Sequence, residues 1–302
     1  MPLQAWQRYR RRAQRALRLP HRPGGPHSAA RTRRSDNFSD PLRSLKRSFD
    51  TLFQGCAADA ACDRAYPHLD QTFYALVTRL NAKPVSFRVT SSDTNKSYTA
   101  LLNGNGLTGL LFQSLYQTSL IPSLPKMIDG LRRGDYTTAA KNYGLAEFDN
   151  SVSLGMYYTV QCGEDAPFTN AKNVEAASKA LPPALRADQL TSNLGELSQC
   201  AVWKVKSASP ARKQPVHSPI PTLALAGQYD PITPPAHSHA VANNLSHGYF
   251  YQFPATGHGV FFSALSTGPC SYRITMSFLD DPTHGPGGSC IAGMKGPAFD
   301  TR

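Results

Sequence analysis

The sequence contains neither Gly-x-Ser-x-Gly nor Gly-x-Cys-x-Gly, the patterns that present a nucleophile on a sharp turn between a strand and a helix. No stretch approaches about 18 consecutive apolar residues, so no membrane span is expected. The N-terminus has no apolar segment of the kind found in secretory signals, so no signal peptide is expected. Neither Cys-x-x-Cys nor the spacing of a zinc site occurs, and we expect no metal and no cofactor.

The first 34 residues contain no Lys, Asp or Glu but ten Arg, so they carry ten of the twelve net positive charges. Residues 35–302 are therefore close to neutral. The stretch Pro20–Pro26 is rich in Pro and Gly, which excludes one continuous helix. Three interpretations stay open: an arm that binds nucleic acid or an anionic membrane, an organellar transit peptide, and a GC-rich gene read in the wrong frame. We expect residues 1–36 to be a basic segment, disordered or foreign to the rest of the fold, and no nucleic acid partner.

Six cysteines occur in the chain, an even number without the spacing of metal ligands. This favours disulfides, and disulfides are typical of an oxidising compartment. Six unrelated buried thiols are the alternative. Each pair of sequence neighbours closes a loop around one structural unit, so the sequence predicts the pairs Cys56 with Cys62, Cys162 with Cys200, and Cys270 with Cys290.

Past residue 36 the apolar pattern predicts a helical region followed by an α/β region. Apolar residues recur at helical spacing in several segments, interrupted by two short alternating runs that predict a hairpin. The predicted helices are 41–54, 65–80, 107–120, 124–133 and 136–143, with a stop at Gly134-Asp135, and the predicted hairpin strands are 85–90 and 97–102.

Residues 154–161 form an apolar and aromatic run that predicts a strand, and strand-like runs follow at 221–226 and 249–253. The order fits an α/β fold: a mainly helical cap inserted ahead of the last strands of an open sheet. We expect the cap at residues 37–150 and the C-terminal part of the sheet domain at residues 151–302.

Two polar residues each follow one of the last two strand-like runs. Asp230 lies in Gly227-Gln-Tyr-Asp-Pro-Ile-Thr-Pro-Pro235, and His258 lies between two glycines. An acid and then a histidine behind successive strands is the second half of a Ser-Asp-His arrangement in that chain order. If so, the Asp230 carboxylate should lie roughly 2.6 to 3.2 Å from His258. The alternatives are that Asp230 caps the turn into a helix near Pro235 and that His258 is a turn residue.

Glu164 and Asp165 directly follow the strand predicted at 154–161. Two adjacent carboxylates at that edge of a sheet suit the α-amino group of a peptide, which would explain cleavage counted from a free N-terminus. The alternative is a turn in which one carboxylate caps the next helix.

Two further motifs have better structural explanations. Residues 104–109 satisfy Gly-x-Gly-x-x-Gly, but the acid twenty residues later, Asp129, lies inside a predicted helix, so no dinucleotide-binding unit forms around it. His237 and His239 are two positions apart on a predicted helix and therefore point in different directions, which argues against a metal site.

Taken together, these residues resemble the α/β-hydrolase fold, and within it the secreted tripeptidyl aminopeptidases of Actinobacteria and relatives. The resemblance covers residues 37 to 290 and rests on 155–168, Cys200-Ala-Val-Trp203, 227–235 and 257–260, with the segments 56–62 and 124–135 in their usual order. It implies that Asp230 is the triad acid, that His258 is the general base, and that the family is secreted or in the cell envelope. The first five strands of that family, its oxyanion loop and its nucleophile elbow have no counterpart in this sequence.

The resemblance implies a serine exopeptidase that releases short peptides from protein N-termini, acting on a peptide substrate. Because the nucleophile is missing, the sequence predicts that this chain is inactive by itself. Two other classes stay open. One is a non-catalytic product, either a pseudoenzyme or a truncated or frameshifted chain, and the other is a binding protein that acts through the basic residues 1–34.

Overall fold

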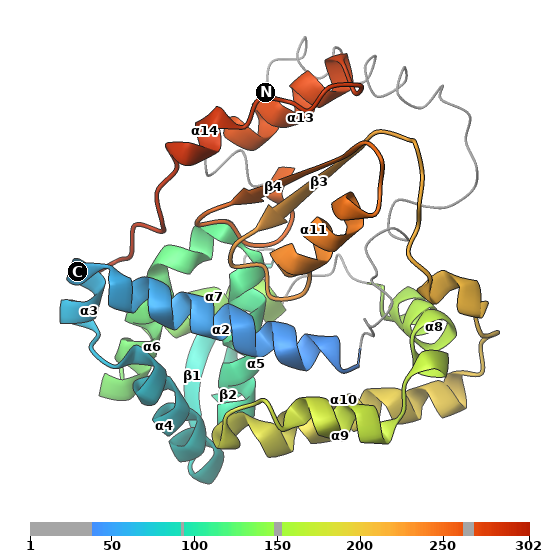
Figure 1. The fold of residues 1–302 in the computed structure, drawn as a ribbon. Coiled ribbons are helices and arrows are strands. Elements are labelled where there is room, and N and C mark those ends of the chain that lie inside the picture. Colours follow the sequence, from blue (N-terminus) through green and yellow to red (C-terminus); the bar gives the residue numbers. More distant parts are fainter. Residues whose placement is uncertain (1–37, 92–93, 148–152, 262–268) are drawn as a thin grey trace.

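The computed structural model describes residues 38–91, 94–147, 153–261 and 269–302, and the predictions for residues 1–36 lie outside these ranges. The chain has a mixed α/β fold that is mostly helical with a few short strands. A helical part at residues 38–213 forms most of the molecule. An α/β part at residues 222–292 lies along one side of it, across α2 (Asp40–Ala58), as Figure 1 shows.

The helical part surrounds one continuous apolar core. In α2, buried apolar residues at helical spacing, such as Leu45, Phe49 and Leu52, confirm the helix predicted at 41–54. Phe49 packs edge to face on Phe73 with ring centroids 5.3 Å apart, which joins α2 to α4. The remaining helices of this part are α3 (Ala60–Ala65), α4 (Leu69–Ala82), α5 (Gly104–Tyr116), η2 (Thr118–Ser123), α6 (Leu124–Arg133), α7 (Thr137–Glu147), α8 (Leu154–Glu164), η3 (Ala166–Phe168), α9 (Ala171–Ser178), α10 (Pro183–Trp203) and η4 (Pro210–Lys213).

Two of the predicted helices have different boundaries in the structure. The helix predicted at 65–80 begins at Leu69 instead, because Pro67 disfavours helical backbone at Tyr66, and His68 adopts a left-handed conformation with φ of 51°. The helix predicted at 107–120 ends at Tyr116, Gln117 is extended, and the separate 3-10 helix η2 follows, with Pro122 inside it.

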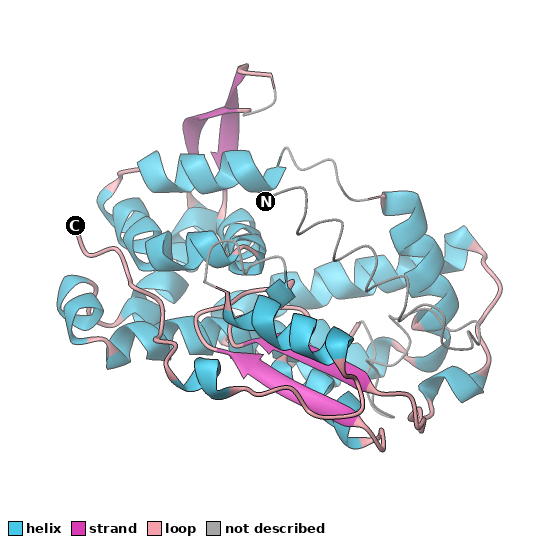
Figure 2. Cartoon of the chain, turned by 90° about the horizontal axis from the view of Figure 1, so that it is seen from above, coloured by secondary structure: helices cyan, strands magenta, loops and turns pink. Residues whose placement is uncertain are grey.

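The predicted hairpin is confirmed. Strand β1 (Val85–Thr90) pairs antiparallel with β2 (Ser97–Leu102), with Val85 opposite Leu102. Figure 2 shows this hairpin on the far side of the molecule from the two parallel strands. The predicted stop after α6 is also confirmed, since Gly134 ends that helix with φ of 84°, a conformation that favours glycine.

Residues 154–161 form helix α8, so the strand predicted there is wrong. The Ser153 side chain accepts a hydrogen bond from the Met156 N–H and begins the helix. Aromatic and β-branched residues favoured a strand, but their preference is weak against tertiary packing. In the helix, Tyr157 and Gln161 lie on one side, one turn apart, where they line a cavity against α10.

The α/β part is a strand-helix-strand unit. Strand β3 (Thr222–Gly227) leads through α11 (Pro235–Asn243) to β4 (Gly248–Phe253), and the two strands pair in parallel along their whole length. Both strands and the helix near Pro235 are as predicted. Helices α13 (Cys270–Asp280) and α14 (Ser289–Ala292) follow, and a second core cluster forms around Phe253 and Ile274.

Three disulfides confirm the predicted cysteine pairs, Cys56–Cys62, Cys162–Cys200 and Cys270–Cys290. They join the end of α2 to α3, α8 to α10, and α13 to α14. No helix in the described part of the chain combines the length and the apolar character that a membrane crossing requires.

Candidate active site

Asp230 lies in the turn directly beyond β3 and is buried. Its Oδ1 accepts hydrogen bonds from the backbone N–H groups of Ile232 and Thr233, each at 2.9 Å. These bonds close the turn that leads into α11. The capping interpretation of Asp230 therefore accounts for one carboxylate oxygen and leaves Oδ2 for a second partner.

His258 lies in the loop beyond β4, which packs on the end of α5. The backbone N–H of His258 donates to the carbonyl of Tyr116 at 3.0 Å, and that of Gly257 donates to Oγ1 of Thr118 at 3.0 Å. A Cβ at position 257 would lie 2.3 Å from the carbonyl oxygen of Leu115. Glycine before the histidine is thus required by this close approach of two backbones.

The side chains of Asp230 and His258 meet beyond the ends of the two parallel strands. Nδ1 of His258 lies 2.9 Å from Oδ2 of Asp230, which confirms the predicted contact. The Thr233 hydroxyl donates to the same Oδ2 at 2.6 Å and lies 3.2 Å from Nδ1. The contact is the geometry that an acid and a base of a triad need. The catalytic role of each residue stays a prediction.

Each partner shifts the pKa of the other. The hydrogen bond to Asp230 raises the pKa of His258, while burial of the ring opposes this shift. Burial raises the pKa of Asp230, but the hydrogen bonds from His258 and Thr233 and the attraction of the imidazolium together outweigh it and hold this pKa below its ordinary value. The pair therefore favours an ionised carboxylate beside an imidazole that readily accepts a proton.

Arg47 of α2 ties the helical part to the turn that holds Asp230. Its guanidinium donates to the backbone carbonyl of Gln228 at 2.8 Å and to that of Asp230. Burial lowers the pKa of Arg47, and the negative charge of Asp230 opposes that shift. Sequence reasoning missed this residue, because a contact across 181 positions has no local pattern.

With Nδ1 on Asp230, Nε2 is the ring nitrogen left for a proton transfer. The His258 side chain is 45% exposed. Within the described ranges no hydroxyl or thiol is hydrogen-bonded to Nε2, and all six cysteines are in disulfides. Among the described residues, the Thr233 hydroxyl contacts the pair on the Nδ1 side, and no hydroxyl or thiol occupies the Nε2 side.

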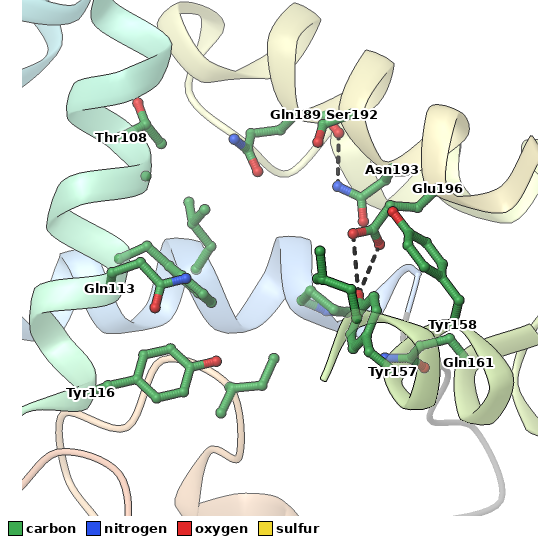
Figure 3. A pocket seen from close by; sticks show the side chains of 16 residues that line it. Thr108, Gln113, Tyr116, Tyr157, Tyr158, Gln161, Gln189, Ser192, Asn193 and Glu196 are labelled. Atoms are coloured by element: carbon green, nitrogen blue, oxygen red, sulfur yellow. Dashed lines mark hydrogen bonds between the residues drawn. The ribbon is translucent and has the colours of Figure 1, made fainter. Parts of the chain in front are cut away.

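A cavity of about 530 Å³ lies beside the pair, between α2, α5, α8 and α10 (Figure 3). Tyr116 lies between the cavity and the Asp230–His258 pair, since its ring centroid is 5.2 Å from that of His258 and its side chain lines the cavity. Ile232, from the turn that holds Asp230, lines the same cavity. Aromatic rings and amide groups make up much of the lining, a combination typical of binding sites for small ligands.

Glu196 on α10 lines this cavity, and sequence reasoning missed it. The Tyr157 hydroxyl lies 3.1 and 3.2 Å from the two carboxylate oxygens of Glu196. Burial raises the pKa of Glu196, and the hydrogen bond from Tyr157 opposes the shift. The strand predicted at 154–161 gave no reason to place Tyr157 opposite Glu196. A helix at 154–161, held to α10 by the predicted Cys162–Cys200 bridge, would have placed these two residues opposite each other.

Glu164 and Asp165 lie at the end of α8, and neither lines the cavity that holds Glu196. Glu164 forms an ion pair with Arg212, and Asp165 forms one with Lys213 at 2.9 Å. Asp165 is completely buried. Both carboxylates therefore have a cation from this chain beside them, and a role for them in binding substrate stays a prediction.

The Gly-x-Gly-x-x-Gly motif lies where α5 begins. A Cβ at Gly104 would be 2.0 Å from the carbonyl oxygen of Val77, so the close contact between α4 and α5 requires this glycine. Asp129 forms ion pairs with Arg132 and Arg133 inside α6. Packing and local charge pairing account for the motif and its distant acid.

His237 and His239 lie on α11, where the His239 ring packs on Phe250 at a centroid distance of 5.0 Å. In the ranges that the structure describes, no three His, Cys, Asp or Glu side chains come together as a set of metal ligands.

Comparison with known proteins finds similarity in the part of the chain that holds Asp230 and His258. Residues 188–290 match the family described as TAP-like protein. Serine protease Hip1 of Mycobacterium bovis and serine protease Hip1 of Mycobacterium tuberculosis are each 23% identical to the chain over 275 residues. The alignment covers 84% of this chain and 51% of each relative, so the chain spans about half the length of the curated relatives it matches. Glu196, Asp230 and His258 lie within the matched family segment.

Proposed function

We propose that this chain supplies the cap and the C-terminal part of a serine peptidase that releases short peptides from protein N-termini. The match of residues 188–290 to the TAP-like family, which belongs to the α/β-hydrolase superfamily, supports this proposal. The observation that carries the proposal is the 2.9 Å contact between His258 and Asp230. The two residues follow successive parallel strands, in the chain order of an α/β-hydrolase triad.

The proposed chemistry uses both nitrogens of one imidazole. Nε2 of His258 takes the proton of a serine hydroxyl as that oxygen attacks the peptide carbonyl, and it returns the proton to the leaving amine. Asp230 holds Nδ1, fixes the tautomer and stabilises the imidazolium that forms. Thr233, which donates to the same carboxylate oxygen, keeps that oxygen oriented toward the ring.

In this proposal the serine comes from a Gly-x-Ser-x-Gly segment that the 302 residues do not contain. Relatives of about twice the aligned length support a contribution from further sequence. The chain alone is expected not to hydrolyse peptides, because nucleophile and base act as a unit and loss of one costs about as much as loss of all. The disulfides favour an oxidising location outside the cytoplasm.

The first experiment measures release of a fluorophore from an N-terminal tripeptide amide. We expect no turnover above background by the 302-residue chain. A polypeptide extended by the upstream coding region, in the frame that encodes Gly-x-Ser-x-Gly, should gain turnover. Asp230→Ala or His258→Ala should then abolish it. His284→Ala is the matched control, since His284 also contacts an aspartate, Asp281 at 2.7 Å, but on the exposed surface.

Turnover by the 302-residue chain itself, inhibited by a serine-directed phosphonate, would contradict the proposal and mean that another serine acts. If no upstream frame encodes the motif, the second candidate, a non-catalytic product, is favoured instead. That candidate is supported by the missing Gly-x-Ser-x-Gly alone.

A further inference from the structure

Among the described residues that line the cavity beside His258, Glu196 is the one charged side chain. The rest of the lining, as far as the structure describes it, consists of apolar, aromatic, hydroxyl and amide groups, without Lys, Arg or His. A carboxylate in such surroundings loses hydration without gaining a countercharge, which is costly. A positive group from outside the chain would offset this cost.

Two carboxylates at the end of α8 have the countercharge that Glu196 on α10 lacks. Glu164 and Asp165 have Arg212 and Lys213 beside them, whereas the hydrogen-bond partner of Glu196 is the neutral Tyr157 hydroxyl. That hydroxyl fixes the orientation of the Glu196 carboxylate and leaves its charge unbalanced. Of the three, Glu196 is the acid prepared to accept a cation.

We propose that Glu196 binds the ammonium group of a free peptide N-terminus. The inference rests on the proposed function and identifies Glu196 as the side chain that restricts the substrates to peptides with a free N-terminus. It assigns to Glu196 the role that the sequence predicted for Glu164 and Asp165.

The surroundings of Glu196 suit an ammonium group in two ways. Tyr157 and Tyr158 line the cavity next to it, with ring centroids 5.4 Å apart, and aromatic faces attract cations. Burial raises the pKa of Glu196, so a bound ammonium would recover the energy that the isolated charge costs.

The position of the cavity explains how the distance from a free N-terminus to the cleaved bond would be set. Figure 3 shows Glu196 with Tyr157 on one side of the cavity and Tyr116 on the other. Tyr116 is the residue that contacts His258. A peptide held by its amine at Glu196 would therefore extend toward Tyr116, and the base would meet a bond a short distance from the N-terminus.

The test measures binding to the 302-residue chain by isothermal titration calorimetry, which requires no nucleophile. The probes are trialanine amide and its N-acetylated form at pH 7, where the α-amino group of the first is mostly protonated. We expect the free amine to bind at least about tenfold more tightly than the acetylated peptide. Glu196→Gln should remove that preference, while Glu175→Gln, the same change on the exposed face of α9, should retain it.

A second measurement uses the unsubstituted chain. The preference for the free amine should decrease as the pH is lowered and Glu196 becomes protonated. Among the described lining residues, the other titratable side chains are Tyr116 on α5 and Tyr157 and Tyr158 on α8, and those of α2 carry no charge.

Equal binding of both peptides, no binding of either, or loss of the preference in Glu164→Gln but not in Glu196→Gln would overturn the inference. Such a result together with turnover by the extended polypeptide would leave the proposed function intact. Amine-selective binding by the 302-residue chain, together with no turnover by the extended polypeptide, would instead contradict the proposed function and retain the role of Glu196.

Discussion

At the residue scale, the candidate site combines contacts that a local pattern predicts with contacts that it does not. Asp230 and His258 each follow a strand-like run in a short recognisable motif, so their meeting could be predicted. Arg47 and Glu196 act through contacts with distant segments, on Asp230 and Tyr157 respectively. No local pattern around Arg47 indicates its partner. For Glu196, the predicted Cys162–Cys200 bridge indicates Tyr157 only if residues 154–161 are placed in a helix.

The titration of His258 tests the contact with Asp230. Because the hydrogen bond to Asp230 raises the pKa of His258, its imidazole should titrate above the ordinary value of about 6.5. Asp230→Asn should bring the pKa down, since burial of the ring then acts unopposed. Imidazole NMR signals followed against pH check this, with Asp281→Asn as the control, since Asp281 is the acid of a second Asp–His contact, on the exposed surface. An unchanged His258 titration in Asp230→Asn would contradict the assigned hydrogen bond.

The same shifts set the pH range in which the contact stabilises the fold. The raised pKa of His258 gives stability that is present below about 6.5 and lost as the pH rises through its folded pKa. The lowered pKa of Asp230 gives stability that is present above about 4 and lost as the pH falls. Asp230→Asn should therefore lower the free energy of unfolding most between about pH 4 and 6.5.

At the element scale, helices and strands with a strong period or a clear boundary could be predicted, and α8 could not. The hairpin alternates, α6 ends at a glycine, and β3 and β4 are apolar runs bounded by turn residues. The run 154–161 has mixed signals: aromatic and β-branched residues, and the exposed Leu154 and Met156 that mark no buried helical face. Ser153 is a local signal that begins the helix, but α10, against which the helix packs, lies outside any local window.

The disulfide between α8 and α10 should contribute more to stability than the one that joins α2 to α3. The loop closed by Cys162 and Cys200 spans 38 positions, against 6 for Cys56 and Cys62. By loop entropy the longer bridge is worth about 4 kcal/mol and the shorter one about 2 kcal/mol. Denaturant unfolding of the two double Cys→Ser variants measures the difference. A larger loss from the shorter loop would show that strain or cavity formation outweighs chain entropy.

At the scale of the whole molecule, the described sheet is small for a parallel one. Parallel strands usually lie in larger sheets with both faces covered, whereas β3 and β4 pair with each other and with no further described strand. The backbone N–H groups of Thr222 and Gln228 bond on the β4 side, to His247 and Phe253. Since N–H directions alternate along a strand, those of positions 223 and 225 point to the opposite edge of β3.

Such an edge is a template for pairing with another chain, so the expressed residues 37–302 should self-associate and be poorly soluble. Light scattering after size exclusion should give a mass that rises with protein concentration. Leu225→Pro removes one N–H from the open edge of β3 without removing a bond to β4, and it should reduce that association. Thr222→Pro is the matched control, because it removes the bond to His247 and should weaken the sheet instead. A monodisperse monomer with a sharp cooperative thermal transition would contradict the prediction and mean that the edge of β3 is covered within the chain.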